Sequence, residues 1–185
     1  MTTEQRFKNA LREMMQTKPL SDINVTTLCE KLHCHRQTFY YHYQDIYDLL
    51  ASIFLNEDVP GLQVCNEVGD ILECLLQYAI RNFEFLRSTY LSAGSDLVND
   101  FFYNKIITKL ISSYSSHSGI GLTKVTYRNV ARRFASNVSS EFGYAFKSQD
   151  ATPNKVEKFL KRYIVSATNV LYPALIVLVK EEKKR

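Results

Sequence analysis

The sequence contains no tryptophan and little glycine or proline, with six glycines and four prolines among 185 residues. Because glycine and proline mark the tight turns of sheet proteins, their scarcity favours long, uninterrupted helices. Hydrophobic residues make up 45% of the chain and charged residues 23%, proportions that are typical of a folded protein and exclude a disordered chain. A chain of this length can bury a substantial core without disulfides or metal.

Cysteine is also sparse, and the four cysteines lack the spacing of a disulfide scaffold: Cys29, Cys34, Cys65 and Cys74. Residues 1–12 are polar and charged and hold no apolar run of the kind that a secretion signal needs. The most apolar stretch, residues 163–179, is interrupted by polar residues and a proline. This stretch is short for a bilayer crossing, so a buried helix at a protein interface is favoured. We therefore predict a cytoplasmic protein that does not span a membrane.

Positive charge is not concentrated at the N-terminus, although the net charge is +4. Residues 1–50 carry six Lys/Arg and six Asp/Glu, and residues 51–150 carry nine and ten. Residues 151–185 carry eight Lys/Arg against three Asp/Glu. Charge alone therefore does not identify a segment that binds nucleic acid.

The sequence lacks the motifs of common catalytic and cofactor sites. It has no phosphate-binding glycine loop, no nucleophile elbow and no paired-carboxylate pattern. Cys29, His33, Cys34 and His35 lie close together, but a zinc site needs a second ligand pair, which is missing. We predict no enzyme activity, no cofactor and no metal site. We interpret Cys29 and Cys34 as small buried hydrophobic residues in preference to a sensor of oxidation.

Helical periodicity runs through almost the whole chain, and no segment alternates as a strand does. Four short helices are expected before Pro60 and longer helices after it, with a loop at residues 115–121. The predicted fold class is all-α, with a three-helix N-terminal head in residues 1–50. A larger helical body is expected in residues 51–185.

Residues 23–50 read INVTTLCEKLHCHRQTFYYHYQDIYDLL and have the layout of a helix-turn-helix. In the second helix, Phe39 and Tyr43 are four residues apart and can both face the interior. The remaining side chains of that helix are large and polar or aromatic, and exposing them contributes little to folding. Their exposure suits DNA binding, because arginine and glutamine pair with base edges while hydroxyls and imidazole reach phosphates. These outward residues are Arg36, Gln37, Thr38, Tyr40, Tyr41 and His42.

This segment resembles the tetracycline-repressor (TetR) family of transcription regulators, whose signature is T-V-x-x-I-A-x-x-A-G-V-S-x-x-T-L-Y-x-H-F-x-x-K-x-x-L. The chain follows that signature without a gap at Asn24, Val25, Leu28, Cys29, Leu32, Cys34, Thr38, Phe39, Tyr40, His42, Tyr43 and Leu49. The resemblance implies a DNA-binding regulator that acts as a homodimer on a palindromic operator. It also implies modulation by a small-molecule effector, and two long C-terminal helices that form a four-helix dimer interface.

The resemblance further implies roles for individual residues. The residues implied to hold phosphates are Thr38, Tyr40 and His42. Those implied to face base edges are Arg36, Gln37, Tyr41 and Thr26, and Thr27 beside Thr26 completes the predicted DNA-binding set.

Three departures from the family pattern bear on DNA binding. His33 stands at the turn glycine and must either adopt a left-handed conformation at some cost or shift the turn. His35 stands at the serine that usually caps the recognition helix, and histidine is a poorer cap. Ile46 stands at the usual lysine, which removes an expected phosphate contact.

Aromatic residues in the body are expected to line an effector pocket, with plain core packing as the open alternative. The candidates are Phe83, Phe101, Phe102, Tyr127 and Phe134. The apolar row Val130, Phe134 and Val138 and the stretch 164–179 are expected to pair with their symmetry mates in the dimer. The stretches RNFEFLRSTYL and FFYNKI also resemble a subgroup of the family that includes activators of dihydroxyacetone-kinase operons.

Two functions remain open from the sequence. The first is a regulator that binds double-stranded DNA as a homodimer and responds to a small molecule or a protein coactivator. The second is a helical protein-interaction module whose DNA reader has weakened, as His33 and Ile46 suggest. The exposed residues 36–38 and 40–42 favour the first function, because decay should erase such a surface.

Overall fold

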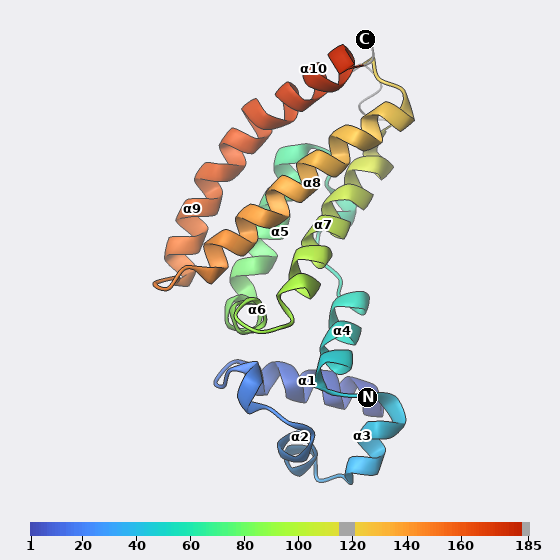
Figure 1. Cartoon of the computed structure of the whole chain (residues 1–185), viewed down its shortest axis with the longest axis vertical. Helices are drawn as coiled ribbons and strands as arrows, with labels where there is room; N and C mark the ends of the chain where they lie inside the picture. The colour runs from blue at the N-terminus through green and yellow to red at the C-terminus, as the bar shows by residue number, and fades with distance from the viewer. Residues whose placement is uncertain (115–120, 183–185) are drawn as a thin grey trace. The chain divides into compact units, whose positions relative to one another are not determined.

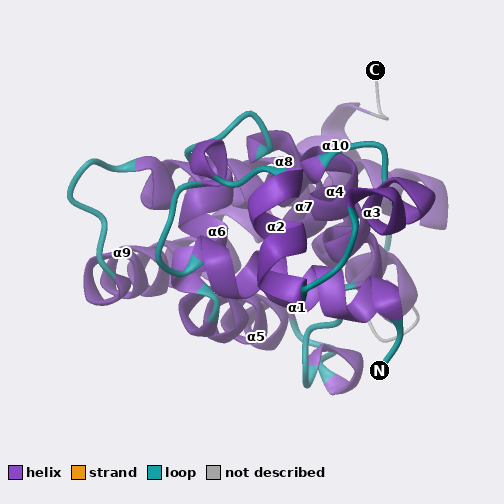
Figure 2. Ribbon diagram, turned by 90° about the horizontal axis from the view of Figure 1, so that it is seen from below, coloured by secondary structure: helices purple, strands orange, loops and turns teal. Residues whose placement is uncertain are grey.

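The computed structural model describes residues 1–114 and 121–182. Helices make up nearly all the regular structure of these residues, and no strand occurs among them (Figure 2). The predicted all-α fold class is confirmed. The loop predicted at residues 115–121 lies almost wholly outside the described residues.

The chain divides into two compact units, residues 1–58 with 82–98 and residues 59–81 with 99–185. The helices and turns of the first unit are α1 (Thr3–Met15), η1 (Leu20–Asp22), α2 (Val25–Leu32), α3 (Arg36–His42), α4 (Ile46–Asn56) and α6 (Phe83–Tyr90). Those of the second unit are η2 (Leu62–Val64), α5 (Val68–Arg81), α8 (Lys124–Lys147), α9 (Pro153–Ser166), the π-helical turn η4 (Ala167–Leu171) and α10 (Tyr172–Glu182). Helix α7 (Ser95–Ser112) begins in the first unit and continues into the second.

The first unit contains the whole predicted DNA-binding segment, residues 1–50, and adds α6 to it. The predicted division of function between residues 1–50 and 51–185 stays a prediction.

Aromatic rings form the centre of the first unit. Phe7 of α1 meets Phe39 of α3 edge to face, with ring centroids 5.3 Å apart, and Tyr43 packs against both rings. Leu11 and Leu28 are fully buried around this cluster. The prediction that Phe39 and Tyr43 face the interior is confirmed.

A second cluster in the same unit joins α1 and α4 to α6. Phe54 of α4 stacks on Phe85 of α6 with ring centroids 5.4 Å apart. The Arg12 guanidinium lies 4.5 Å from the centroid of the Phe85 ring and also forms an ion pair with Glu57. Three helices are therefore held together by one stacked pair and one cation placed over its face.

In the second unit, α8 runs beside α9 and α10 (Figure 1). Val130, Phe134 and Val138 of α8 are completely buried, and the Phe134 ring packs against Tyr172 of α10 with centroids 5.1 Å apart. This row is therefore core of its own unit and is not available to a partner subunit. The expectation that it forms the dimer interface is corrected, because helical periodicity marks a buried face without saying which helix covers it.

The outer face of η4 and α10 is largely apolar and exposed, whereas that of α9 mixes the exposed Phe159 and Val165 with exposed charged residues. These charged residues are Lys155, Lys158, Lys161 and Arg162. The continuous helical segment Pro153–Glu182 has 30 residues and a mean hydropathy of 1.5 over its most apolar stretch, of which 22% is buried. By length and composition alone this helix could cross a membrane. The π-helical turn precedes Pro173, which cannot donate a hydrogen bond to residue 169, so the helix continues past the proline with a wider turn.

Candidate nucleic-acid interface

Helix α2 begins at a reciprocal cap. The Thr27 N–H donates to Asn24 Oδ1 at 3.0 Å, and the Asn24 N–H donates to Thr27 Oγ1 at 3.2 Å. The Thr27 hydroxyl also donates to the Asn24 carbonyl at 3.0 Å. Thr27 thus has a structural role in the cap, whereas Thr26 beside it is exposed. Contact of either residue with DNA stays a prediction.

The turn between α2 and α3 keeps the geometry that the family achieves with glycine. His33 has φ 51° and ψ 48°, which is the left-handed conformation. Its N–H donates to the Glu30 carbonyl at 3.1 Å, and the Cys34 N–H donates to the Cys29 carbonyl at 3.0 Å. These two bonds form a Schellman motif that ends α2. Of the two outcomes expected for His33, the strained one is observed and the turn is not shifted.

We expect the His33→Gly variant to be more stable than the wild type by about 1 kcal/mol in the free energy of unfolding, because glycine adopts this conformation without steric cost. The matched control is His35→Gly, since His35 has φ −78° and gains nothing from glycine. Urea unfolding of both variants measures the difference. Equal destabilisation by the two changes would mean that His33 carries no strain.

The two cysteines of the turn differ in their surroundings. Cys29 is buried, and burial together with a hydrogen bond to Cys34 raises the pKa of Cys29 to about 11. Its thiol is therefore protonated at neutral pH and behaves as a small hydrophobic side chain. Cys34 is only half-buried, so the same interpretation fits it less well.

Helix α3 has no side-chain cap at His35, in agreement with the expectation that histidine is a poor cap. Arg36 and Gln37 are exposed on its first turn, Tyr40 is 58% exposed and Tyr41 is 85% exposed. On two turns of helix this face carries a guanidinium group, an amide and two phenols. Groups of these kinds can pair with base edges and phosphates in a major groove.

Two of the predicted phosphate contacts lie deeper than the rest. Thr38 and His42 are half-buried, and the His42 Nδ1 atom lies 3.5 Å from Glu4 Oε1 of α1. His42 therefore connects α3 to α1 as well as bordering the exposed face of α3.

The start of α4 contains two hydrogen-bonded carboxylates that were not predicted from the sequence. Ile46 is 8% exposed and belongs to the core. Its side chain therefore contributes to packing, and it cannot bind a phosphate as a lysine at this position would. The Asp48 N–H donates to Asp45 Oδ1 at 2.8 Å, and the Gln44 N–H donates to Asp48 Oδ2 at 3.0 Å. Asp45 therefore caps α4, and Asp48 holds the residue before that cap. Both carboxylates lie beside the position where the family signature has a lysine, which weakens attraction to phosphate at this point. The signal in the sequence is the Asp-x-x-Asp spacing, which is a capping pattern.

All five aromatic residues predicted to line an effector pocket are buried: Phe83, Phe101, Phe102, Tyr127 and Phe134. Phe83 belongs to the first unit and the other four to the second. Phe101 and Phe102 pack edge to face with ring centroids 5.2 Å apart, and the Tyr127 hydroxyl lies 2.7 Å from that of Tyr172. A role for these residues in effector binding stays a prediction.

Comparisons with known proteins bear on the fold. No family model matches the chain, and no curated protein matches it. Among solved structures, the dihydroxyacetone kinase operon activator DhaS is similar, with a TM-score of 0.64 and 18% sequence identity. The match covers 91% of this chain and 97% of DhaS. The chain therefore shares the fold of DhaS along nearly its whole length.

Proposed function

We propose that this chain is a cytoplasmic, TetR-like transcription regulator that binds duplex DNA as a homodimer through α3. The observation that carries the proposal is the exposed face of α3, where Arg36, Gln37, Tyr40 and Tyr41 project from a helix that is seated on a buried Phe39. The strained turn at His33 supports it, because the chain keeps the helix-turn-helix geometry at a cost in stability. The fold of DhaS, an operon activator by name, adds to this support.

A gel shift with the DNA that flanks the chain's own gene tests the proposal. We expect a retarded complex that a random duplex of equal length does not form at the same salt concentration. The alternative, a protein-interaction module with a weakened DNA reader, predicts equal and weak binding of both duplexes. A reporter fused to the same DNA then distinguishes activation from repression.

The homodimer is proposed from the apolar face of α9, η4 and α10. Its exposed members are Phe159, Val165, Val170, Val177 and Leu178, and Tyr144 of α8 extends it through a ring contact with Phe159 at 5.8 Å. Exposed apolar residues in such number, although interspersed with Lys158, Lys161 and Arg162 on α9, are typical of an interaction surface. Since four-helix interfaces form from two such helices in each subunit, a second copy of the chain fits it better than lipid.

We expect Val165→Glu and Val170→Glu each to convert a dimer to a monomer at micromolar concentration, because each change would bury a carboxylate in the interface. These valines are 61% and 66% exposed in the single chain. The matched control is Leu55→Glu, which changes a residue that is 84% exposed on α4 and should leave the dimer intact. Light scattering measures the mass, and a monomeric wild type would contradict the dimer.

A further inference from the structure

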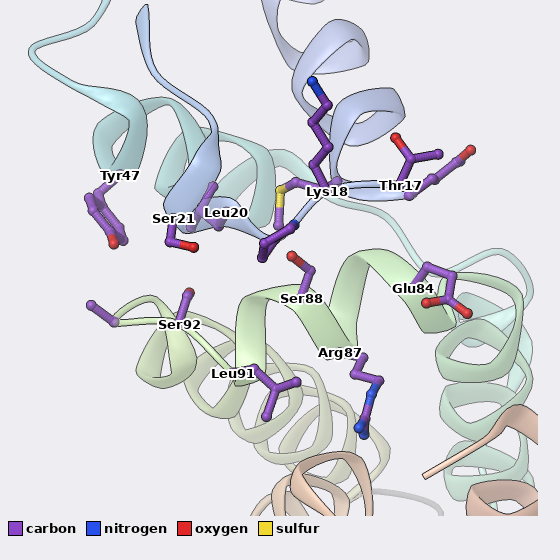
Figure 3. A pocket seen from close by; sticks show the side chains of 14 residues that line it. Thr17, Lys18, Leu20, Ser21, Tyr47, Glu84, Arg87, Ser88, Leu91 and Ser92 are labelled. Carbon is purple, nitrogen blue, oxygen red and sulfur yellow. The ribbon is translucent and has the colours of Figure 1, made fainter. Parts of the chain in front are cut away.

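The first unit contains a cavity of about 370 Å³ that lies outside the predicted DNA-binding set. Residues 15–21, at the end of α1 and the entry to η1, form one wall, and α6 with the turn after it forms the other (Figure 3). Tyr47 of α4 stands at one end. A volume of this size falls within the range of small-molecule sites.

Ser88 on α6 is the polar side chain that distinguishes this cavity from an ordinary surface groove. Its Oγ atom is buried and has no hydrogen-bond partner among the described residues. The neighbouring Thr89 donates from its hydroxyl to the Phe85 carbonyl at 2.8 Å, which is the usual arrangement for a helical hydroxyl. Figure 3 shows Ser88 pointing instead across the cavity, toward the segment that carries Leu20. A buried hydroxyl without a hydrogen-bond partner is uncommon, and it indicates a site where a ligand supplies that partner.

The remaining walls define the chemistry of that partner. The hydroxyls of Ser21, Tyr47 and Ser92 gather at one end, while Lys18 and Arg87 extend away from the centre and Glu84 lies at the opposite end (Figure 3). The Ser21 hydroxyl donates to Asp22 Oδ1 at 3.0 Å and the Ser92 hydroxyl to the Thr89 carbonyl at 2.7 Å, so these two oxygens can serve a ligand as acceptors. Apolar surface is supplied by Met15, Pro19, Leu20 and Leu91. We propose that the cavity binds a small uncharged molecule with several hydroxyl groups and one apolar face, of the size of a monosaccharide. Its hydroxyls would pair with Ser88 and the hydroxyl-rich end, and its carbon face would pack on the apolar side chains.

An occupant of this cavity would contact α1, whose Phe7 packs on Phe39 of α3, and α4, which follows α3 in the chain. Helix α1 packs against α2 and α4, and Tyr47 is the second residue of α4, which follows α3 after three residues. A ligand that fits one arrangement of α1, α4 and α6 better than another would shift the orientation of α3. This regulatory part rests on the proposed DNA-binding function, whereas binding of the ligand does not.

The direct test uses the full chain without DNA. A panel of pentoses, hexoses and their alcohols is titrated while amide chemical shifts are followed by NMR. We expect saturable shifts for amides at residues 15–21, 47 and 84–93, with a Kd of about 1 mM or tighter for at least one member. Absence of saturation across the panel, or shifts concentrated elsewhere, overturns the site. Binding of a phosphorylated sugar more than about tenfold tighter than its parent overturns the uncharged class.

Three variants locate the binding. Ser88→Ala removes one hydrogen bond and should weaken binding about two- to tenfold. Ser21→Leu fills the cavity from an exposed position of η1 and should weaken binding at least about tenfold without lowering the Tm. Ser140→Ala, on the exposed face of α8, should leave binding unchanged. Equal affinities in all three variants would place the ligand elsewhere.

A second arm tests regulation with the sugar that binds. Saturating sugar should change operator affinity about 5- to 150-fold for the wild type and not for Ser21→Leu. Unchanged operator affinity overturns the regulatory part and leaves the ligand site standing. A wild type that binds no operator with or without sugar counts against the proposed function, while the NMR result still decides the site.

Discussion

Phe39→Ala should lower the free energy of unfolding of the first unit by about 3–5 kcal/mol, which is a large share of the stability of a typical domain. Phe39 is fully buried, and its ring contacts Phe7 and Tyr43. Its removal leaves a cavity where α1 and α3 meet, and the residues around it are too tightly packed to fill the space. Urea unfolding followed by circular dichroism measures the loss.

Tyr40→Ala is the matched control, because Tyr40 is the next residue along α3 and is largely exposed. It should change the free energy of unfolding by no more than about 1 kcal/mol, although its ring meets Phe39 edge to face. Similar losses from the two changes would contradict the assignment of Phe39 to the interior face and Tyr40 to the exposed one.

Arg36→Ala and Gln37→Ala should each weaken operator binding by about 1–3 kcal/mol and relax the preference for one or two base pairs. The reason is that each side chain presents a pair of donors or a donor and an acceptor that match one base edge. Fluorescence anisotropy with the operator and with single-base variants of it measures both effects at fixed salt.

Tyr40→Phe provides the contrasting variant, because it removes a hydroxyl that is predicted to reach a phosphate. It should weaken binding of all sequences alike and leave the preferred site unchanged. His42→Ala should behave similarly, but it also removes the contact with Glu4, so Tyr40→Phe is the cleaner change. If Arg36→Ala and Gln37→Ala left affinity and preference untouched, α3 would not be the recognition helix.

Much of the fold was predictable because its signals are local. The end of the short helices before Pro60 and the inward direction of Phe39 and Tyr43 both depend on residues within one or two turns of helix. The left-handed His33 was foreseen as one of two outcomes, because the turn must satisfy the end of α2 whichever residue stands there.

Other features could not be read from the sequence because they depend on which surfaces meet. Apolar periodicity alone cannot distinguish a core face from an interface, and the structure assigns Val130 to the core while it leaves Val165 exposed. The cavity beside Ser88 arises where the end of α1 faces α6, which comes much later in the chain. The Tyr127–Tyr172 hydroxyl pair likewise joins two helices that are distant in sequence.

Selection of binding sites from a random pool of duplex DNA by the wild-type chain tests the central claim most directly. A homodimer that reads DNA through two copies of α3 should enrich a pseudo-palindrome whose half-sites lie about one helical turn apart, or a multiple of it. The double variant Arg36→Ala with Gln37→Ala should lose that enrichment under the same conditions. Enrichment of no sequence by the wild type, or of the same palindrome by the double variant, would contradict the account.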